Sequence, residues 1–263
     1  MNQWGVCTAV ENWPIVRDAG WAFVEENVQS MLQGEAPENE WLAPIRMRKV
    51  KLKPGDVPAA NCLVPGHLKI TGPAVDTPRL KAYMTNVMRR AGLIGMKVLV
   101  FGSAGARNVP EGFDRDRARA QILEFLKYSA DLAAASNVTL VAEHLNVPES
   151  NIINTIPEAM GYVRELNHPN FLCLADSWHF WLMNEKLEDL QAAMGSIRHV
   201  HLADKEGRVA PGLSGKSDYR PFFKVIKDSG YTGRISVEAK FVPDLATKAK
   251  DVLAYVKTAW AEA

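Results

Sequence analysis

Four ionisable side chains occupy the same kind of position in this chain, the end of a short apolar segment. Glu143 ends "VTLVAE", Asp176 ends "FLCLAD", His201 lies in "RHVHLAD" and Glu238 lies in "RISVEAKF". Three carboxylates brought together without a counter-charge would repel one another and be driven toward their protonated forms. A divalent cation removes that repulsion, and two Glu, one Asp and one His suit Mn²⁺, Mg²⁺, Co²⁺ or Zn²⁺. The residue types therefore predict a mixed oxygen and nitrogen metal site.

Each candidate also has a plain structural explanation when it is taken alone. A single glutamate at the end of a strand is commonly solvated or caps a helix, and His199 is expected to pack inside the fold rather than bind a metal. Three further histidines lie in loop-like sequence and are expected at the surface: His67, His144 and His168. The recurrence of charge at four consecutive segment ends is what favours a metal site.

The elements that must position these residues alternate between strands and helices. Strand patterns at 97–102, 138–143, 171–176, 197–204 and 233–241 alternate with helix patterns at 114–137, 155–167, 185–195, 218–230 and 244–263. The first third adds strands at 3–7, 21–27 and 59–64, a helix near 13–19 and another at 77–95. Eight alternating units predict a single (β/α)₈ barrel over residues 1–263. A doubly wound open sheet is the alternative, but no glycine-rich phosphate-binding sequence follows the first strand.

In such a barrel the ligand face lies at the carboxyl ends of the strands. Strand alternation puts Glu143 on the same face as Thr139 and Val141, and Asp176 on the same face as Leu172 and Leu174. The four candidate ligands should therefore point inward on neighbouring strands. Residues 31–59 are expected to form a long loop, which could act as a lid and contribute to specificity.

Composition places the chain among ordinary globular proteins. It is 47% hydrophobic and 23% charged, and its formal net charge of +1 indicates no polyanionic partner. The three cysteines include no CxxC pair and are expected to be reduced core residues of a cytoplasmic protein. Neither a signal peptide nor a membrane-spanning segment is expected, because no basic start leads into an apolar region and no long uncharged apolar run occurs.

With these residues identified, the sequence resembles the xylose isomerase-like barrel superfamily, in particular its ketose 3-epimerases and hydroxypyruvate isomerases. Four stretches carry the resemblance: "EHLNVPESNIINT" (143–155), "DSWH" (176–179), "HVHLAD" (199–204) and "SVEAKF" (236–241). A fifth stretch, "GRVAPG" (207–212), is similar to a hydroxypyruvate isomerase pattern.

The resemblance implies a role for seven residues. One divalent ion, expected to be Mn²⁺ with Mg²⁺, Co²⁺ or Zn²⁺ as alternatives, would be bound by Glu143, Asp176, His201 and Glu238. Of these, Glu143 and Glu238 would also be the catalytic bases. Substrate contacts are implied for Glu149, His179 and Arg208, and Glu25 matches a glutamate that the family carries on the second strand.

A DNA-cleaving relative, endonuclease IV, is not expected. That enzyme holds three metals with extra histidines, whereas here no histidine lies between His67 and His144 or after His201. With a net charge of +1 as well, no nucleic-acid partner is expected.

The predicted function is that of a divalent-metal-dependent sugar epimerase or isomerase. A metal would stabilise the enediolate formed when a proton leaves the carbon next to a carbonyl, and two glutamates from non-adjacent strands could remove and return the proton. The partner would be a non-phosphorylated keto sugar or small hydroxy-ketone, and the protein a homo-oligomer, either dimer or tetramer. Two alternatives remain: a lyase or dehydratase that eliminates from a 3-keto-glycoside or keto-inositol, and a non-catalytic sugar-binding barrel.

Overall fold

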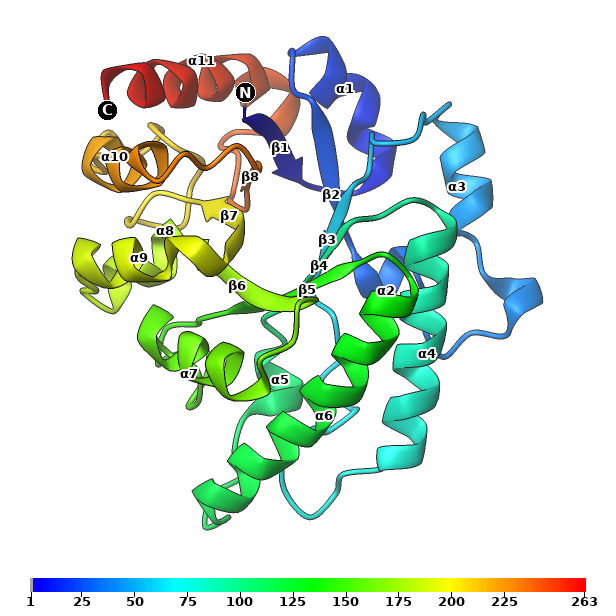
Figure 1. The fold of residues 1–263 in the computed structure, drawn as a ribbon. Coiled ribbons are helices and arrows are strands. Elements are labelled where there is room, and N and C mark those ends of the chain that lie inside the picture. Colours follow the sequence, from blue (N-terminus) through cyan, green and yellow to red (C-terminus); the bar gives the residue numbers. More distant parts are fainter. Residues whose placement is uncertain (1) are drawn as a thin grey trace.

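The strands of the protein close into one parallel barrel, seen in a computed structural model that describes residues 2–263 (Figure 1). Eight strands follow one another around it in chain order: β1 (Gln3–Cys7), β2 (Phe23–Asn27), β3 (Ala59–Asn61), β4 (Val98–Phe101), β5 (Thr139–Glu143), β6 (Phe171–Asp176), β7 (Ile197–Leu202) and β8 (Arg234–Val237). The barrel closes where Trp4 of β1 lies opposite Ile235 of β8. The predicted (β/α)₈ barrel is therefore confirmed, and the open sheet is excluded.

Helices cover the outside of the barrel (Figure 1). The main ones are α1 (Trp13–Asp18), α4 (Thr77–Leu93), α6 (Arg115–Ala135), α7 (Ile156–Leu166), α9 (Leu187–Ala193), α10 (Arg220–Asp228) and α11 (Leu245–Glu262). Side-chain N-caps mark the start of several of these helices. Asp114 accepts a hydrogen bond from Arg117 N at the start of α6, and Thr155 accepts one from Glu158 N at the start of α7. No helix of the described residues combines the length and apolarity needed to cross a membrane.

Side chains alternate between two apolar regions along the strands β3 to β6. Val141 and Leu174 belong to a small cluster inside the barrel, whereas Leu140 and Ala175 belong to the large core between strands and helices. This is the alternation that strand geometry requires. It also means that inward-facing positions at the carboxyl ends of the strands point into the mouth of the barrel.

Several short helices lie in the segments that connect the strands and the longer helices. They are α2 (Val28–Met31), α3 (Ala43–Lys49), α5 (Ala104–Arg107) and α8 (Ser177–Leu182), with 3₁₀ turns at Val10–Asn12, Glu38–Glu40 and Met194–Ser196. Strand β3 ends at Asn61, earlier than the predicted residue 64, because Cys62 has a φ of +55° and cannot continue an extended strand.

The segment 31–59, predicted to be a long loop, contains α3 and a 3₁₀ turn and is fastened to α4. The buried guanidinium of Arg90 in α4 donates to the carbonyls of Leu32 (2.9 Å) and Ala36 (2.7 Å) and lies over the Trp41 ring. Trp41 in turn donates through Nε1 to the carbonyl of Met31 (2.9 Å). This part of the segment is therefore held beside the barrel.

Candidate active site

The four predicted metal ligands converge at the carboxyl end of the barrel. Glu143 ends β5, Asp176 ends β6, His201 lies near the end of β7, and Glu238 directly follows β8. One ligand atom of each lies within 4.8 Å of one from every other. Glu143, Asp176 and His201 are buried, and the Glu238 side chain is 20% exposed. We call these four residues the metal cluster.

Two features of the metal cluster fit a cation. Asp176 uses Oδ1 to accept the backbone N–H groups of Trp178 (2.7 Å) and His179 (3.0 Å), while its Oδ2 is buried without a hydrogen-bond partner. A buried carboxylate oxygen without a partner is costly, and a bound cation would satisfy it. Beside it, Glu143 Oε2 occupies the space that a Cβ on Gly102 would need. The arrangement therefore leaves room for this carboxylate by having no side chain at residue 102.

His201 is oriented by a carboxylate on the opposite side of its ring. Its Nε2 lies 2.9 Å from Glu25 Oε1, so its Nδ1 faces Glu143 Oε1 (3.1 Å) and Glu238 Oε2 (3.4 Å). The other oxygen of Glu25 contacts His199 Nε2 (2.6 Å) and accepts from Ser236 Oγ (2.6 Å). A carboxylate in this position sets the tautomer and direction of a metal-binding histidine.

A second group, made by Cys7, Glu25 and His201, also has ligand atoms within 4.8 Å of one another. It is less suited to a metal, because hydrogen bonds already engage both oxygens of Glu25. Burial, followed by the charge of Glu25, raises the pKa of the Cys7 thiol well above its usual range. The thiolate that a metal requires is thus disfavoured there.

In the absence of a cation, bound protons offset part of the negative charge of the metal cluster. Burial first, and the Glu238 charge second, raise the pKa of Glu143 to about 7. Burial opposes the charge on His201, but Glu25 and neighbouring negative groups outweigh it and raise the pKa of His201 well above its usual range. For Asp176 and Glu238, nearby positive groups outweigh burial and lower each pKa. Protons on Glu143 and His201 are therefore favoured in the metal-free protein.

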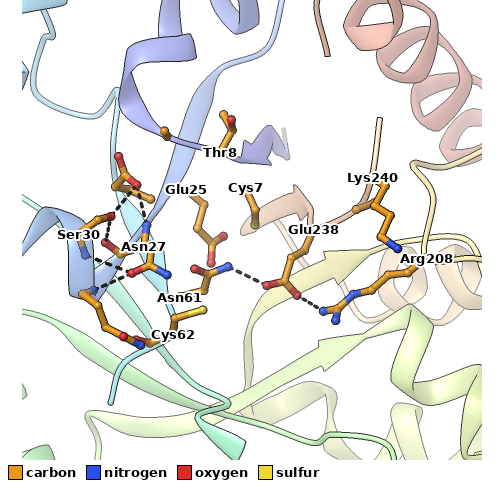
Figure 2. A pocket seen from close by; sticks show the side chains of 14 residues that line it. Cys7, Thr8, Glu25, Asn27, Ser30, Asn61, Cys62, Arg208, Glu238 and Lys240 are labelled. Atoms are coloured by element: carbon orange, nitrogen blue, oxygen red, sulfur yellow. Dashed lines mark hydrogen bonds and ion pairs between the residues drawn. The ribbon is translucent and has the colours of Figure 1, made fainter. Parts of the chain in front are cut away.

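Glu238 is held from two sides by residues that line a cavity (Figure 2). Its Oε1 accepts from Asn61 Nδ2 (2.7 Å), and its Oε2 from Arg208 Nη2 (2.8 Å). Arg208 also reaches Glu149 Oε1 (3.3 Å) and lies 4.4 Å over the Trp178 ring. Two of the predicted substrate-binding residues, Glu149 and Arg208, are thus brought to the metal cluster.

The third predicted substrate-binding residue, His179, is a buried hydrogen-bond donor. Its Nδ1 accepts the backbone N–H of Asn146 (3.0 Å), so in the neutral ring the hydrogen is on Nε2. Burial lowers the pKa of His179 to about 4 despite the nearby charge of Asp176. Its Nε2 has no partner within the structure and is free to donate to a ligand.

A cavity of about 800 Å³ adjoins the metal cluster on the side of β1, β2 and β3 (Figure 2). Its lining includes Thr8, Asn27, Gln29, Ser30, Asn61, Cys62, Arg208, Glu238 and Lys240. Glu238 belongs to both the cavity and the cluster. Within the described part of the chain, residues 31–59 contribute nothing to this lining. Asn27 and Asn61 end β2 and β3, so the strand-end rule that identified Glu143 would have found them too.

The prediction that His144 lies at the surface is wrong. Its side chain is fully buried, because the residue after β5 turns toward the end of β6, where Nε2 accepts the backbone N–H of Asp176. His67 is exposed as expected, and His199 is buried inside the barrel as expected. The cysteines are free as expected, but Cys7 and Cys62 are half-buried cavity-lining residues rather than core residues.

Comparisons with known proteins give one family and several related folds. A sequence profile described as "Xylose isomerase-like TIM barrel" matches residues 15–259. Among curated proteins, L-ribulose-5-phosphate 3-epimerase UlaE of Salmonella typhi is 32% identical over 127 residues, or 47% of this chain and 44% of the relative. UlaE of Salmonella enteritidis PT4 matches over the same extent. The match therefore spans less than half the length of these curated relatives.

Solved structures resemble the whole chain. The 3-keto-D-glucoside 4-epimerase YcjR from E. coli superposes with a TM-score of 0.81 at 20% identity, covering 98% of this chain and 100% of that one. An L-ribulose 3-epimerase gives 0.81 at 16% identity, with 100% and 95% covered. A D-allulose 3-epimerase from Methylomonas sp. gives 0.80 at 19% identity, with 98% of each covered. At these identities the likeness establishes the fold.

Proposed function

Because the chain belongs to the xylose isomerase-like TIM barrel family, we propose that it is a divalent-metal-dependent sugar epimerase or isomerase. One observation carries the proposal: two glutamates from non-adjacent strands, Glu143 and Glu238, belong to one metal cluster and have their pKa values shifted in opposite directions. Pairs of titratable groups with pKa values pushed apart are typical of acid and base catalysts. The curated relative is named a 3-epimerase, which supports the same class of reaction.

The metal ion would be held by Glu143, Asp176, His201 and Glu238. When bound, a divalent ion supplies positive charge to the carbonyl oxygen and the neighbouring hydroxyl as negative charge develops on them. The donor set of three carboxylates and one imidazole suits Mn²⁺, which remains the proposed ion.

Glu143 and Glu238 would exchange the proton on the carbon next to the carbonyl. They extend from β5 and from the end of β8, so they reach the reacting carbon from different sides. One glutamate, present as the carboxylate, takes the proton and becomes a carboxylic acid, and the other, present as the carboxylic acid, delivers its own proton to the opposite face and becomes a carboxylate, which inverts the centre. Delivery to the adjacent carbon instead would isomerise the sugar.

Three further residues would position the substrate. The Nε2–H of His179 is an unpartnered donor in a buried site, suited to a substrate oxygen. Arg208 donates to Glu238 and to Glu149, so a hydroxyl inserted between them could accept from the guanidinium and donate to a carboxylate. These roles agree with those implied by the sequence resemblance.

The cavity indicates where the rest of the substrate would lie. It extends from Glu238 over β1, β2 and β3, so carbons remote from the reaction would meet the neutral polar side chains of Thr8, Asn27, Ser30 and Asn61 (Figure 2). The lining holds three carboxylates, Glu25, Glu26 and Glu238, and two cations, Arg208 and Lys240, so it lacks the excess of positive charge that favours a phosphate. We therefore propose a non-phosphorylated keto sugar or hydroxy-ketone as substrate.

The test is hydrogen exchange from a panel of keto sugars in D₂O with Mn²⁺, followed by NMR. The wild type should place deuterium on the carbon next to the carbonyl of at least one sugar and yield a product isomeric with it. Glu143→Gln should abolish exchange, because an amide cannot take the proton, whereas Glu188→Gln, at an exposed position on α9, should exchange normally. An unsaturated product would instead identify the lyase alternative. Metal binding without any exchange would favour a sugar-binding barrel.

A homo-oligomeric state and a cytoplasmic location are predictions from the sequence that stand beside this proposal. Sedimentation velocity of the purified chain would measure the first.

A further inference from the structure

His144 points away from the metal cluster, although it directly follows Glu143 in the chain. Its imidazole is fully buried, and Nε2 accepts the backbone N–H of Asp176 at 3.2 Å. A ring nitrogen that accepts a hydrogen bond carries no hydrogen, so the hydrogen of the neutral ring must be on Nδ1. That nitrogen lies 2.9 Å from Oε1 of Glu185, which is an ion-pair distance without hydrogen-bond alignment, and neither atom has another hydrogen-bond partner among the described residues.

Glu185 continues the contact into the surrounding helices. Its side chain is only 3% exposed, and its Oε2 accepts the backbone N–H of Ile156 at 2.6 Å, at the start of α7. The backbone N–H of Glu185 donates to the carbonyl of Phe180 at 3.0 Å, in α8. The His144 and Glu185 pair therefore connects the end of β5, the end of β6, α7 and α8.

The residue at the centre of these contacts is the metal ligand Asp176. Its carboxylate is held at Oδ1 by the first backbone N–H groups of α8, and its own backbone N–H is held by His144. These contacts restrain both the backbone and the carboxylate of Asp176. Its unpartnered Oδ2 therefore points toward the metal cluster. His144 also packs edge-on against the ring of His179, with the ring centroids 6.1 Å apart.

Burying the polar pair of His144 and Glu185 is energetically unfavourable compared with burying apolar side chains. Removing an imidazole and a carboxylate from water costs free energy that an apolar pair of similar volume would not incur. Such pairs serve best where they select one geometry, and groups that orient metal ligands commonly affect metal affinity by about 10–100-fold.

We propose that His144 and Glu185 are positioning residues, a buried pair that aims the Asp176 carboxylate and thereby sets the metal affinity of the cluster. The inference rests on the metal site within the proposed function and is independent of which sugar is used. Neither residue touches the cluster's ligand atoms through its own side chain, so both act through Asp176.

Two substitutions at residue 144 distinguish the roles of the two imidazole nitrogens. His144→Gln keeps an acceptor near the position of Nε2 for the Asp176 N–H, whereas His144→Asn keeps only a polar group near the position of Nδ1. We expect His144→Gln to bind Mn²⁺ within a few-fold of the wild type and His144→Asn to bind it about 10–100-fold more weakly. The measurements are calorimetric titration with Mn²⁺ and the electron paramagnetic resonance spectrum of bound Mn²⁺. His168→Asn, at a half-buried histidine before β6, is the matched control and should leave the affinity unchanged.

Glu185→Gln provides a second test that keeps an acceptor for Ile156 N–H. Its amide NH₂ would face Nδ1 and favour the ring with hydrogen on Nε2, which opposes the Asp176 N–H. The affinity for Mn²⁺ should fall about tenfold, and the double variant with His144→Asn should bind no more weakly than His144→Asn alone, because groups that act as one unit are non-additive.

Different results would overturn the inference and the proposed reaction. If folded His144→Asn and Glu185→Gln both bind Mn²⁺ like the wild type, or if all variants lose affinity only in proportion to thermal stability, the pair is merely structural. A wild type that binds none of the four candidate ions overturns the pair's role together with the metal site. Mn²⁺ binding without deuterium exchange from any sugar refutes the proposed reaction and leaves the positioning pair standing.

Discussion

Gly102→Ala is the most selective perturbation of the proposed site, because it adds one methyl group and removes no functional group. Gly102 follows β4 and is buried beside Glu143. A Cβ there would lie closer than 3.0 Å to Glu143 Oε2, whereas ordinary contacts begin at 3.4 Å, so the oxygen must retreat by more than 0.4 Å. The backbone at Gly102 has no positive φ, so alanine adds no conformational strain.

That displacement exceeds what a metal site tolerates. Ligand distances in metal sites keep to within about 0.2 Å of their ideal values, so the variant should lose at least about tenfold in Mn²⁺ affinity. Misplacement of a catalytic group by about 1 Å costs about 100-fold in rate, so deuterium exchange at saturating Mn²⁺ should fall between about 10- and 100-fold.

The assays are Mn²⁺ titration calorimetry and NMR-monitored exchange in D₂O. Gly161→Ala is the matched control, because nothing lies within 4 Å of a Cβ at that position in α7. It should leave both readouts unchanged and stabilise the helix by about 0.5–1 kcal/mol. Wild-type affinity and exchange in Gly102→Ala would refute the assigned position of Glu143 in the metal cluster.

Three further predictions follow from the charges around the cluster. The affinity for Mn²⁺ should rise with pH. Glu143, with a pKa of about 7, is protonated below that pH in the metal-free protein. His201, whose pKa is raised well above its usual range, must also lose a proton before it can bind the ion. Titration calorimetry at about pH 6 in buffers of different ionisation enthalpy should detect the released protons, and a pH-independent affinity would contradict this. Glu25→Gln should weaken Mn²⁺ binding about tenfold without unfolding the protein, measured by titration and thermal melting, because the charge that orients His201 is lost; unchanged affinity would show that Glu25 plays no such part. Arg208→Lys should lower kcat/KM for exchange at least about tenfold with Mn²⁺ affinity nearly unchanged, because an ammonium cannot span both Glu238 and Glu149; a wild-type kcat/KM would exclude the proposed substrate contact.

The sequence by itself determined the barrel and the strand-end positions of the candidate ligands. Local patterns carry that information: β1 and β6 coincide with the predicted strands at 3–7 and 171–176, and Asp114 and Thr155 cap α6 and α7. Parallel strands end at the same edge of a barrel, so knowing that Glu143 and Asp176 end consecutive strands was enough to place them together.

Tertiary structure decided what surrounds those ligands. Closure of the barrel brings Glu25 of β2 to His201 of β7 and Asn61 of β3 to Glu238 after β8, pairs that lie 176 and 177 residues apart in the chain. No local pattern encodes such contacts, because they depend on which side chains point across the interior. The same holds for His144, whose loop-like sequence suggested the surface while the turn after β5 buries it against Asp176. The sequence therefore identified which residues could bind a metal, and only the packing of distant strands determined how each one is aimed.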